Sequence, residues 1–441
     1  MSSPTLLSTL DYAPYESLYK TLHQNPNLSN NETFASSTVH KHLETLNASL
    51  PPQAPNFTIH TGIGGYGLAA VLRNGGGGRG GPIVLLRADM DALPVLEKTG
   101  LEYTSKNRET DADGVEKPVM HACGHDMHVT CLLACAEVLA KSPDTWNGTL
   151  VLVFQPAEEK GTGAQAMVDD GLYDRLGLTP DVVLGQHVFP IRAGEVQVRK
   201  GTQMAAADSF RITVFGRGGH GSMPHRTIDP VVLASSIVVR LQAVVSREVD
   251  PAESAVVTVG SLVAGEAENV IPETAVLKVN VRTQSEEGRR RVLGAVRRVV
   301  EGESRASGCE REAEIETIAG FPLTVNDPEV VEKVGEALKE KFGERFDGEC
   351  VASNASEDVS ILASSVGKPS CFWFFGGMDE EKWDQAVKEG RVYEDIPVNH
   401  SSYFAPVIQP TLKTGVEALC VSALAFLGKK GGAEGLADRS R

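Results

Sequence analysis

The sequence predicts an α/β protein with a largely parallel sheet and a second, smaller domain inserted into it. Before residue 205, short apolar runs alternate with helix-like stretches; over 206–318 strands of period two replace them, and the first pattern then resumes. We therefore expect a catalytic domain made of 1–205 and 319–430, with an inserted domain of 206–318. The remaining residues, 431–441, are rich in glycine and charge and predict a disordered tail.

The strands of the first domain are predicted from apolar runs of three to five residues. A strand covered on both faces of a parallel sheet has few polar positions, so such runs predict buried strands. The runs are Ile83–Leu86, Leu150–Phe154 and Val182–Leu184, and helices are predicted at His128–Leu139, from Gly163 to Val168 and at Thr411–Leu427.

The inserted domain has a different element order. Its predicted elements are strand Ser209–Val214, helix Pro230–Val245, strands Ala255–Val259 and Ala275–Val281, helix Glu286–Gly302 and strand Ala313–Ile318. The order β-α-β-β-α-β is typical of a ferredoxin-like sandwich.

The composition excludes several classes of partner. A formal net charge of −16 argues against nucleic acid, because phosphate binding requires a basic face. No apolar run approaches the roughly 20 residues of a membrane span, so no membrane partner is expected. The N-terminus shows no secretory signal, and seven cysteines without scaffold spacing predict reduced thiols and a cytoplasmic location.

The sequence contains two glycine-rich stretches, and the first is predicted not to bind a dinucleotide. Gly62–Gly67 fits the dinucleotide fingerprint GxGxxG, but the short run after it leaves no room for the helix that this fingerprint requires. The stretch Gly75–Gly81 lies between two strand-like segments and predicts a flexible hairpin loop.

The segment HACGHDMH (121–128) carries the first candidate metal ligands. It contains Cys123 and His125, and it follows a loop and opens a helix. Thiolate and imidazole are ligands that suit zinc, manganese, cobalt or nickel. A histidine-rich surface loop is the alternative interpretation.

Further candidates follow apolar strands, where sites in open α/β sheets form. Of the adjacent Glu158 and Glu159, one could bind metal while the other serves as general base, although a solvated acidic turn fits equally. His187 follows another apolar run, and His400 lies late in the chain. A lone histidine is more often structural, so the hypothesis depends on these residues occurring together.

Taken together, these segments resemble the M20 metallopeptidase family, most closely its amidohydrolase branch. This branch contains hippurate hydrolases, N-acyl-amino-acid amidohydrolases and plant auxin-conjugate hydrolases. The matching pieces occur in family order: RADMDALP (87–94), HACGHD (121–126), QPAEE (155–159), GHGSMP (219–224) with Asp229–Pro230, NVIP (269–272), SED (356–358) and His400–Ser401.

The resemblance implies two divalent metal ions, zinc or manganese with cobalt and nickel as alternatives, and an inserted lid domain through which a homodimer forms. By position, it assigns the metal ligands as Cys123, His125, Glu159, His187 and His400. Cys123 stands where other branches place a bridging Asp, so we expect it to bridge the metals. Glu158 is then the general base, which takes a proton from a water whose pKa the metals lower and returns it to the departing amine.

Three further residues match or depart from the family pattern: Asp91, Asp89 and Asn27. Asp91, in a segment that could otherwise be a solvated acidic loop, matches the carboxylate that orients a ligand in other branches. Asp89 stands where those branches carry a metal-binding His, a change that the amidohydrolase branch shares. Asn27 stands where the branch commonly has Glu, and this departure leaves every expected ligand in place.

The inserted domain carries three expected substrate residues. The resemblance suggests that His220 polarises the scissile carbonyl or stabilises the oxyanion, from the partner subunit of a dimer, whereas a glycine-flanked turn residue is the alternative. Asn269 and Arg282 are candidates for holding a substrate carboxylate, which Arg binds in a bidentate manner. Arg282 at a strand end fits a surface ion pair equally well.

The expected reaction is the hydrolysis of a linear amide C–N bond in N-acyl amino acids or related small-molecule conjugates. An aminopeptidase or dipeptidase of the same fold is the first alternative, and Cys123 favours the amidohydrolase over it. A non-catalytic metal-binding scaffold is the second alternative, against which the intact Glu158 and His220 argue.

Overall fold

The computed structural model describes residues 10–75, 81–111 and 114–429. The chain forms two compact units. The main unit runs to Gln203, resumes over Val325–Val351 and continues from Asp358, and the inserted unit comprises Met204–Thr324 and Ala352–Glu357. The short return Ala352–Glu357, expected in the catalytic domain, thus belongs to the inserted unit.

An eight-stranded sheet forms the centre of the main unit, in the order β1-β2-β6-β3-β7-β18-β8-β17. The strands are β1 (Thr58–Ile63), β2 (Gly67–Asn74), β3 (Ile83–Asp89), β6 (Gly148–Gln155), β7 (Val182–Arg192), β8 (Val196–Gln197), β17 (Phe346–Asp347) and β18 (Ser370–Met378). β3 is parallel to β6 and β7, and β7 is parallel to β18, whereas β2 is antiparallel to both its neighbours. The carboxyl ends of β3, β6, β7 and β18 therefore meet at one edge, as the predicted α/β class requires.

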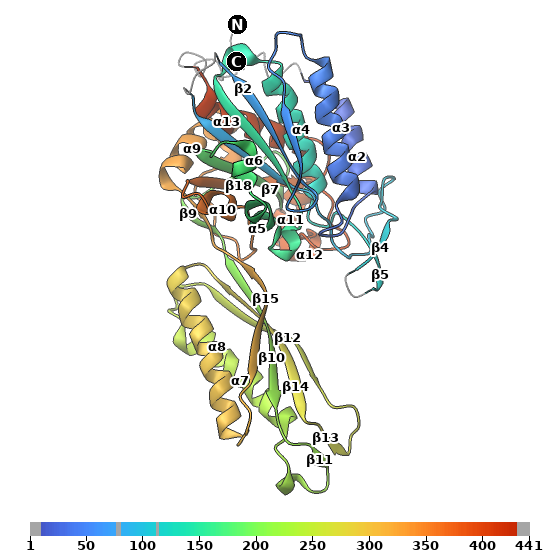
Figure 1. The fold of residues 1–441 in the computed structure, drawn as a ribbon, viewed down its shortest axis with the longest axis vertical. Coiled ribbons are helices and arrows are strands. Elements are labelled where there is room, and N and C mark those ends of the chain that lie inside the picture. Colours follow the sequence, from blue (N-terminus) through green and yellow to red (C-terminus); the bar gives the residue numbers. More distant parts are fainter. Residues whose placement is uncertain (1–9, 76–80, 112–113, 430–441) are drawn as a thin grey trace. The chain divides into compact units, whose positions relative to one another are not determined.

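Helices cover both faces of this sheet. α4 (His125–Ala140) and α13 (Thr411–Leu427) pack against each other and against β3 and β7. α2 (Ala13–Gln24) and α3 (Thr33–Ser49) lie beside α4 (Figure 1). The remaining helices are α5 (Gly163–Asp169) on β6, α6 (Leu172–Leu176) on β1, α9 (Pro328–Phe342) on α13 and β18, α10 (Ser360–Ser364) and α11 (Glu380–Glu389) on β7, and α12 (Val392–Asp395) beside α11. Because both faces are covered, the strands are continuously apolar, which is why short runs sufficed to predict them.

The glycine-rich stretches differ in outcome. β2 and β3 flank Gly75–Gly81 but do not pair, because β6 lies between them in the sheet. The predicted hairpin is therefore wrong, and residues 76–80 lie outside the described part of the chain, as does the tail expected at 431–441. Gly62–Gly67 forms the turn from β1 into its antiparallel neighbour β2, with no helix after it.

The inserted unit is the predicted ferredoxin-like sandwich. Its elements are β10 (Ala206–Phe215), α7 (Pro230–Glu248), β12 (Ala255–Ala264), β14 (Thr274–Thr283), α8 (Glu286–Ala306) and β15 (Glu314–Phe321), and the antiparallel sheet has the order β12-β14-β10-β15. The helices begin where the sequence provides caps. The Asp229 carboxylate accepts from Val231 N at 2.8 Å, and the Ser285 hydroxyl accepts from Gly288 N at 2.9 Å.

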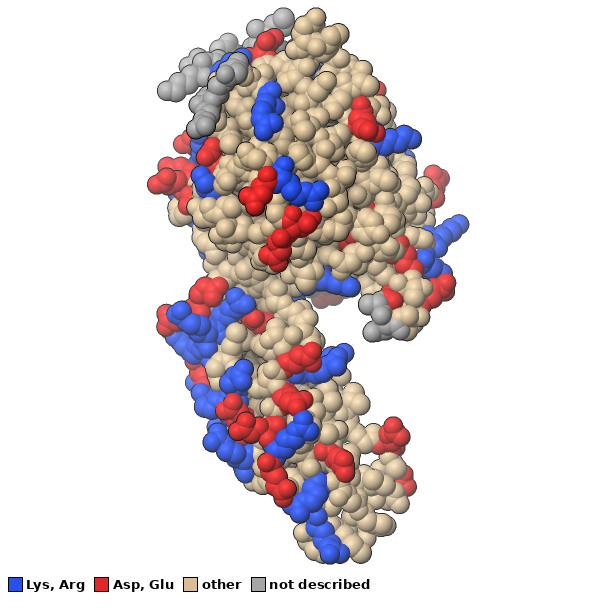
Figure 2. All heavy atoms as spheres, viewed as in Figure 1, with Lys and Arg blue, Asp and Glu red and all other residues tan. Residues whose placement is uncertain are grey.

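The two helices of the inserted unit have contrasting surfaces. Among the described helices, α7 alone is long and apolar enough to cross a membrane, judged by length and composition only. Its residues Leu233, Ile237 and Leu241 are buried in the core of this unit, a face that any helix packed on a sheet must have. Over α8, basic and acidic side chains alternate (Figure 2), and they form pairs such as Arg291 with Glu287.

Short strands complete the fold in separate two-stranded sheets. These are β4 (Arg108–Thr110) with β5 (Glu116–Pro118), β9 (Gly201–Met204) with β16 (Thr324–Asn326), and β11 (Gly219–His220) with β13 (Val270–Ile271). Two of the expected substrate residues lie at the pair β11–β13. His220 is in β11, and Asn269 directly precedes β13.

Candidate metal centre

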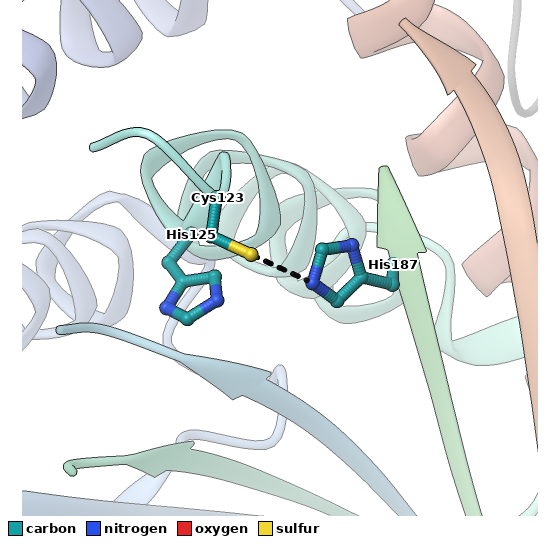
Figure 3. Close-up of side chains that lie close together, drawn as sticks. All are labelled: Cys123, His125 and His187. Carbon is teal, nitrogen blue, oxygen red and sulfur yellow. Dashed lines mark hydrogen bonds between the residues drawn. The ribbon is translucent and has the colours of Figure 1, made fainter. Parts of the chain in front are cut away.

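Four segments of the main unit bring together the five residues expected to bind metal. Cys123 precedes α4 and His125 begins it, Glu159 follows β6, His187 lies in β7 and His400 lies in the loop after α12. The ligand atoms of Cys123, His125 and His187 all lie within 4.8 Å of one another (Figure 3), and so do those of Cys123, Glu159 and His400. Cys123 is common to both groups, which is the position that a bridging ligand requires.

A glycine allows the start of α4 to approach β7 closely. Gly124 has φ +87°, and a Cβ built on it would lie 2.4 Å from Cγ1 of Val188. Any other residue would be strained there and would push the two segments apart. This approach places the Sγ atom of Cys123 3.4 Å from Nε2 of His187.

Two of the histidines are oriented by the hydrogen bonds of their outer nitrogens. His187 Nδ1 lies 2.7 Å from the carbonyl oxygen of Val188, and His125 Nδ1 lies 3.2 Å from a carboxylate oxygen of Asp91. Both partners can only accept, so Nδ1 carries the proton in each ring. When the ring is neutral, Nε2 is left as a lone-pair donor that points into the site, the arrangement that metal-binding histidines share.

The donor set fits a pair of divalent metals. Nε2 of His125 and Oε1 of Glu159 are buried and have no hydrogen-bond partner among the described residues. Leaving such atoms unsatisfied costs about 1–3 kcal/mol each, so native proteins rarely tolerate two together without a ligand. Sulfur, nitrogen and carboxylate oxygen together are typical donors for zinc and its neighbours in the transition series.

The electrostatics of the site also favour cations. Burial opposes a charged imidazole, yet the nearby Asp89 and Asp91 raise the pKa of His125 to about 10. Burial raises the pKa of the Cys123 thiol well above its usual value, and the charges of Glu159 and Glu158 raise it further. Excess negative charge thus surrounds these two side chains, so metal binding would displace protons from them.

The turn after β6 aims two adjacent glutamates at the site. Ala157 has φ +48°, a left-handed conformation that is unusual for a residue other than glycine. Its N–H donates to the buried carboxylate of Glu32 at 2.8 Å, and the N–H of Glu159 donates to Asp91 at 3.0 Å. As a result, a carboxylate oxygen of Glu158 and one of Glu159 each lie 3.9 Å from Nε2 of His125.

His128 is a site residue that the sequence analysis missed. Its Nδ1 donates to Asp89 at 2.6 Å and its Nε2 accepts from the N–H of Val188 at 2.8 Å, so neither nitrogen is available to a metal. The ring packs beside those of His125 and His187, at centroid distances of 5.4 and 4.5 Å. The spacing His125–x–x–His128 on one helix face was the signal that could have revealed it.

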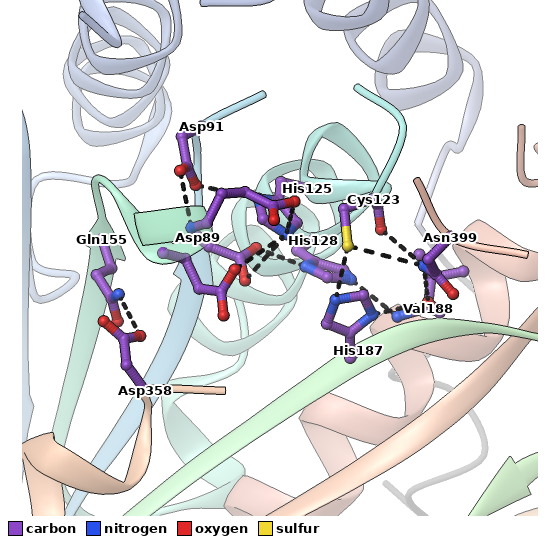
Figure 4. A network of polar contacts seen from close by, with 12 residues as sticks. Asp89, Asp91, Cys123, His125, His128, Gln155, His187, Val188, Asp358 and Asn399 are labelled. Atoms are coloured by element: carbon purple, nitrogen blue, oxygen red, sulfur yellow. Dashed lines mark hydrogen bonds and ion pairs between the residues drawn. The ribbon is translucent and has the colours of Figure 1, made fainter. Parts of the chain in front are cut away.

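A buried polar network lies next to the candidate ligands (Figure 4). Arg87 donates to Gln155 at 2.9 Å, to Asp89 at 2.6 Å and to Asp358 at 3.2 Å, and Gln155 donates to Asp358 at 2.7 Å. These contacts connect three of the sequence segments that define the resemblance. Asp89 thus takes part in positioning His128 and β3, at the position where other branches have a metal-binding His.

Asn27, which stands where the branch commonly has Glu, forms hydrogen bonds through both its side chain and its backbone. The side chain of Asn27 donates to Glu109 at 2.5 Å and accepts from the N–H of Phe34 at 2.9 Å. Its carbonyl accepts from the N–H of Ala92, next to Asp91, at 2.8 Å. Asn27 therefore connects Glu109 and the start of α3 with the segment that carries Asp91.

The expected substrate residues lie in the inserted unit, in two different environments. His220 and Asn269 are exposed at the β11–β13 pair, and the N–H of Gly221 donates to the carbonyl of Asn269 at 2.7 Å. Arg282 is half-buried and donates to Asn280, to the Asn354 carbonyl and to the Ser356 hydroxyl, at 3.1, 2.7 and 3.3 Å. These partners are neutral, so the surface ion pair considered for Arg282 is not among them.

Comparison with known proteins identifies the family. A model of peptidase family M20/M25/M40 matches residues 85–403. The chain belongs to this family. It is 38% identical to hippurate hydrolase of Campylobacter jejuni over 75% of this chain and 80% of that protein, and 36% identical to an N-acetyl-L-cysteine deacetylase of Bacillus subtilis over 91% and 89%. A solved Bacillus subtilis structure, a dinuclear metal-binding peptidase of the M20 family, is similar with a TM-score of 0.71 and 26% identity, covering 96% of this chain and 99% of that one.

The M20 family assignment agrees with the geometry of the site. Relatives in its amidohydrolase branch are named as hydrolases and deacetylases of N-acyl amino acids, and the family includes dinuclear metal proteins. The protein is therefore an M20 hydrolase with the mostly parallel sheet and separate four-stranded sheet of this fold.

Proposed function

We propose that this protein hydrolyses the amide bond of N-acyl amino acids or related conjugates with the help of two divalent metal ions. The observation that carries the proposal is the set of sulfur, nitrogen and oxygen donors in which the buried Cys123 belongs to both groups of ligand atoms. The names of the relatives, hippurate hydrolase and N-acetyl-L-cysteine deacetylase, support the substrate class. Zinc or manganese is the proposed metal, and cobalt or nickel would suit the same donors.

The proposed metal ligands form two groups that have Cys123 in common. Cys123 would be shared by the two groups of donors that hold the metals, with His125 and His187 in one group and Glu159 and His400 in the other. When bound, the two ions lower the pKa of the attacking water and polarise the scissile carbonyl. Asp91 keeps Nε2 of His125 directed into the site and holds the backbone N–H of Glu159, so one carboxylate orients both groups.

Glu158 is the proposed general base. Its carboxylate is nearly buried and lies beside Glu159 in the same turn, so one acid can hold metal while the other handles protons. It takes a proton from the attacking water and later gives that proton to the departing amine nitrogen, which leaves as a neutral amine.

The inserted unit is proposed to supply substrate contacts and a dimer surface. Nδ1 of His220 accepts from the N–H of Ser222 at 3.1 Å, so the neutral ring carries its proton on Nε2 and can donate it to an oxyanion. Asn269 and Arg282 are proposed to hold the substrate carboxylate. Exposed apolar side chains on α7 and β12, among them Val239 and Val263, suit a second copy of the chain, from which His220 would act.

A pair of variants tests the two glutamate roles. We expect Glu158→Gln to retain both metals and to lose at least about two orders of magnitude in kcat, the usual scale for a general base. Glu159→Gln, one residue away, should instead lower metal content. Metal analysis and the rate of hydrolysis of an N-acyl amino acid measure both, and near-normal turnover in Glu158→Gln would refute the assignment.

An aminopeptidase or dipeptidase activity is the second candidate, favoured by the similar solved structure being a peptidase. The metal ligands would be the same, so the substrate alone decides. A panel of N-acyl amino acids against free dipeptides, compared by kcat/KM, distinguishes the two. Preference for a free α-amino group would establish the second candidate.

A further inference from the structure

Asn399 lies immediately before the proposed ligand His400 and contacts the other side of the site. Its amide nitrogen lies 3.2 Å from the carbonyl oxygen of Cys123, 3.3 Å from the carbonyl oxygen of Val188 and 3.8 Å from Sγ of Cys123 (Figure 4). All three partners accept hydrogen bonds, so the nitrogen of the amide, and not its oxygen, must face them.

These contacts connect Asn399 with three proposed ligands. The Val188 carbonyl also accepts from Nδ1 of His187, so Asn399 and His187 donate to the same oxygen. Cys123 is contacted at both its carbonyl and its sulfur. His400 follows Asn399 directly in the chain, so one side chain connects the segments that carry all three ligands.

The backbone at His400 needs such support. His400 has φ +70°, a conformation that non-glycine residues rarely adopt, and its side chain is 55% exposed. Its N–H donates to the carbonyl of Ala122 at 2.7 Å. This bond and the Asn399 amide together hold the loop against the segment of Cys123, because little core packing surrounds an exposed residue.

We propose that Asn399 is a positioning residue of the metal centre, which docks the His400 loop and donates an N–H to the Cys123 thiolate. This inference rests on the proposed two-metal function. A donor N–H beside sulfur stabilises its negative charge and withdraws electron density from it, so it lowers the energy of the sulfur lone pairs that interact with the metals.

Cobalt(II) substitution of the whole protein makes the effect visible, because thiolate-to-cobalt charge transfer gives an absorption band. Asn399→Leu keeps the approximate size of the side chain but removes the donor. We expect the band to move to lower energy and the metal affinity, measured by chelator competition, to fall 10–100-fold, the scale for residues that orient ligands. Asn399→Asp has the same shape without the donor and should shift the band likewise, whereas Asn399→Gln keeps the amide and should restore part of the affinity.

Asn74 provides the matched control. It is also half-buried, and its amide donates to two backbone carbonyls, those of Pro143 and Trp146, at 2.6 and 2.7 Å. Asn74→Leu should leave the band and the affinity unchanged. Equal effects of the two leucine variants, or an unchanged band and affinity in both Asn399→Leu and Asn399→Asp, would overturn the inference alone. A wild-type protein that binds cobalt without the band would refute the Cys123 ligand, and the inference with it.

Discussion

The main unit and the inserted unit differ in how their candidate residues are held. In the main unit, Cys123, His125 and His187 are buried, and each histidine ring is fixed by a hydrogen bond of its Nδ1. In the inserted unit, His220 is exposed, and among the described residues its ring is hydrogen-bonded to Ser222 alone, two residues away. The proposed metal ligands therefore all belong to one unit, whereas the inserted unit carries the residues that are proposed to contact the substrate. Variants of the two units should therefore fail in different ways.

The largest effect that would sharpen this contrast is expected at His220. His220→Ala should lower kcat about 10²- to 10³-fold, because one oxyanion donor is removed, while the bound metal stays unchanged. Turnover and metal content are measured on the same preparation. Loss of metal in this variant would contradict the division of roles between the units.

Mixing variants shows which subunit supplies His220. If His220 of one subunit acts at the metal site of the other, a mixed dimer of His220→Ala and Glu158→Gln contains one intact site. About half of the dimers are mixed after random exchange of equal amounts, so about a quarter of wild-type activity should return. Each variant alone serves as the control. If activity stays at the level of the separate variants although mixed dimers are present, His220 acts within its own chain.

A smaller effect is expected at Asp91, within the main unit. Asp91 accepts from the rings or backbone of two proposed ligands, His125 and Glu159, and from the hydroxyl of Ser29 at 2.7 Å. Asp91→Asn should weaken metal binding 10–100-fold, as is usual for residues that orient ligands. Ser29→Ala removes only the third contact and should change affinity much less. Unaltered affinity in Asp91→Asn would show that the ligands are held without it.

The sequence alone predicted what depends on local pattern. The strands β3 and β6 were found from their apolar runs, and two candidate ligands, Glu159 and His187, from polar residues that follow such runs. The predicted hairpin at Gly75–Gly81 failed because strand order is not local: β6, more distant in the chain, pairs with both β2 and β3.

The supporting residues were missed for the same physical reason. His128 depends on the N–H of Val188, 60 positions away, and Asn399 depends on Cys123, 276 positions away. The sequence alone does not distinguish a polar side chain that positions a ligand from one that faces solvent, because its hydrogen-bond partners are distant in the chain. Family resemblance could supply ligand roles by position, but it gave no role to residues whose partners are set by tertiary packing.

The smallest expected effect concerns His23, a buried histidine that contacts Asp126, the residue after the proposed ligand His125. This effect depends on pH. His23 is fully buried, with Nδ1 2.7 Å from Asp126 and Nε2 3.1 Å from Glu97. Both carboxylates accept, so the geometry requires a proton on each ring nitrogen. Burial alone would lower the pKa of His23, but its bonds to Asp126 and Glu97 raise that pKa to about 9.

The raised pKa predicts a pH-dependent contribution to stability. Because the folded pKa lies above the unfolded value of about 6.5, the stabilisation is complete below about pH 6.5 and is lost as the pH rises through about 9. His23→Gln should therefore lower the free energy of unfolding by about 3 kcal/mol at pH 6, and the difference should shrink toward zero above pH 9. Urea unfolding across this range measures it, with His40→Gln, at a partly exposed position, as the control. A deficit in His23→Gln that stays constant with pH would mean that the ring is neutral, and that the α2–α4 contact beside the metal ligands depends on packing instead of charge.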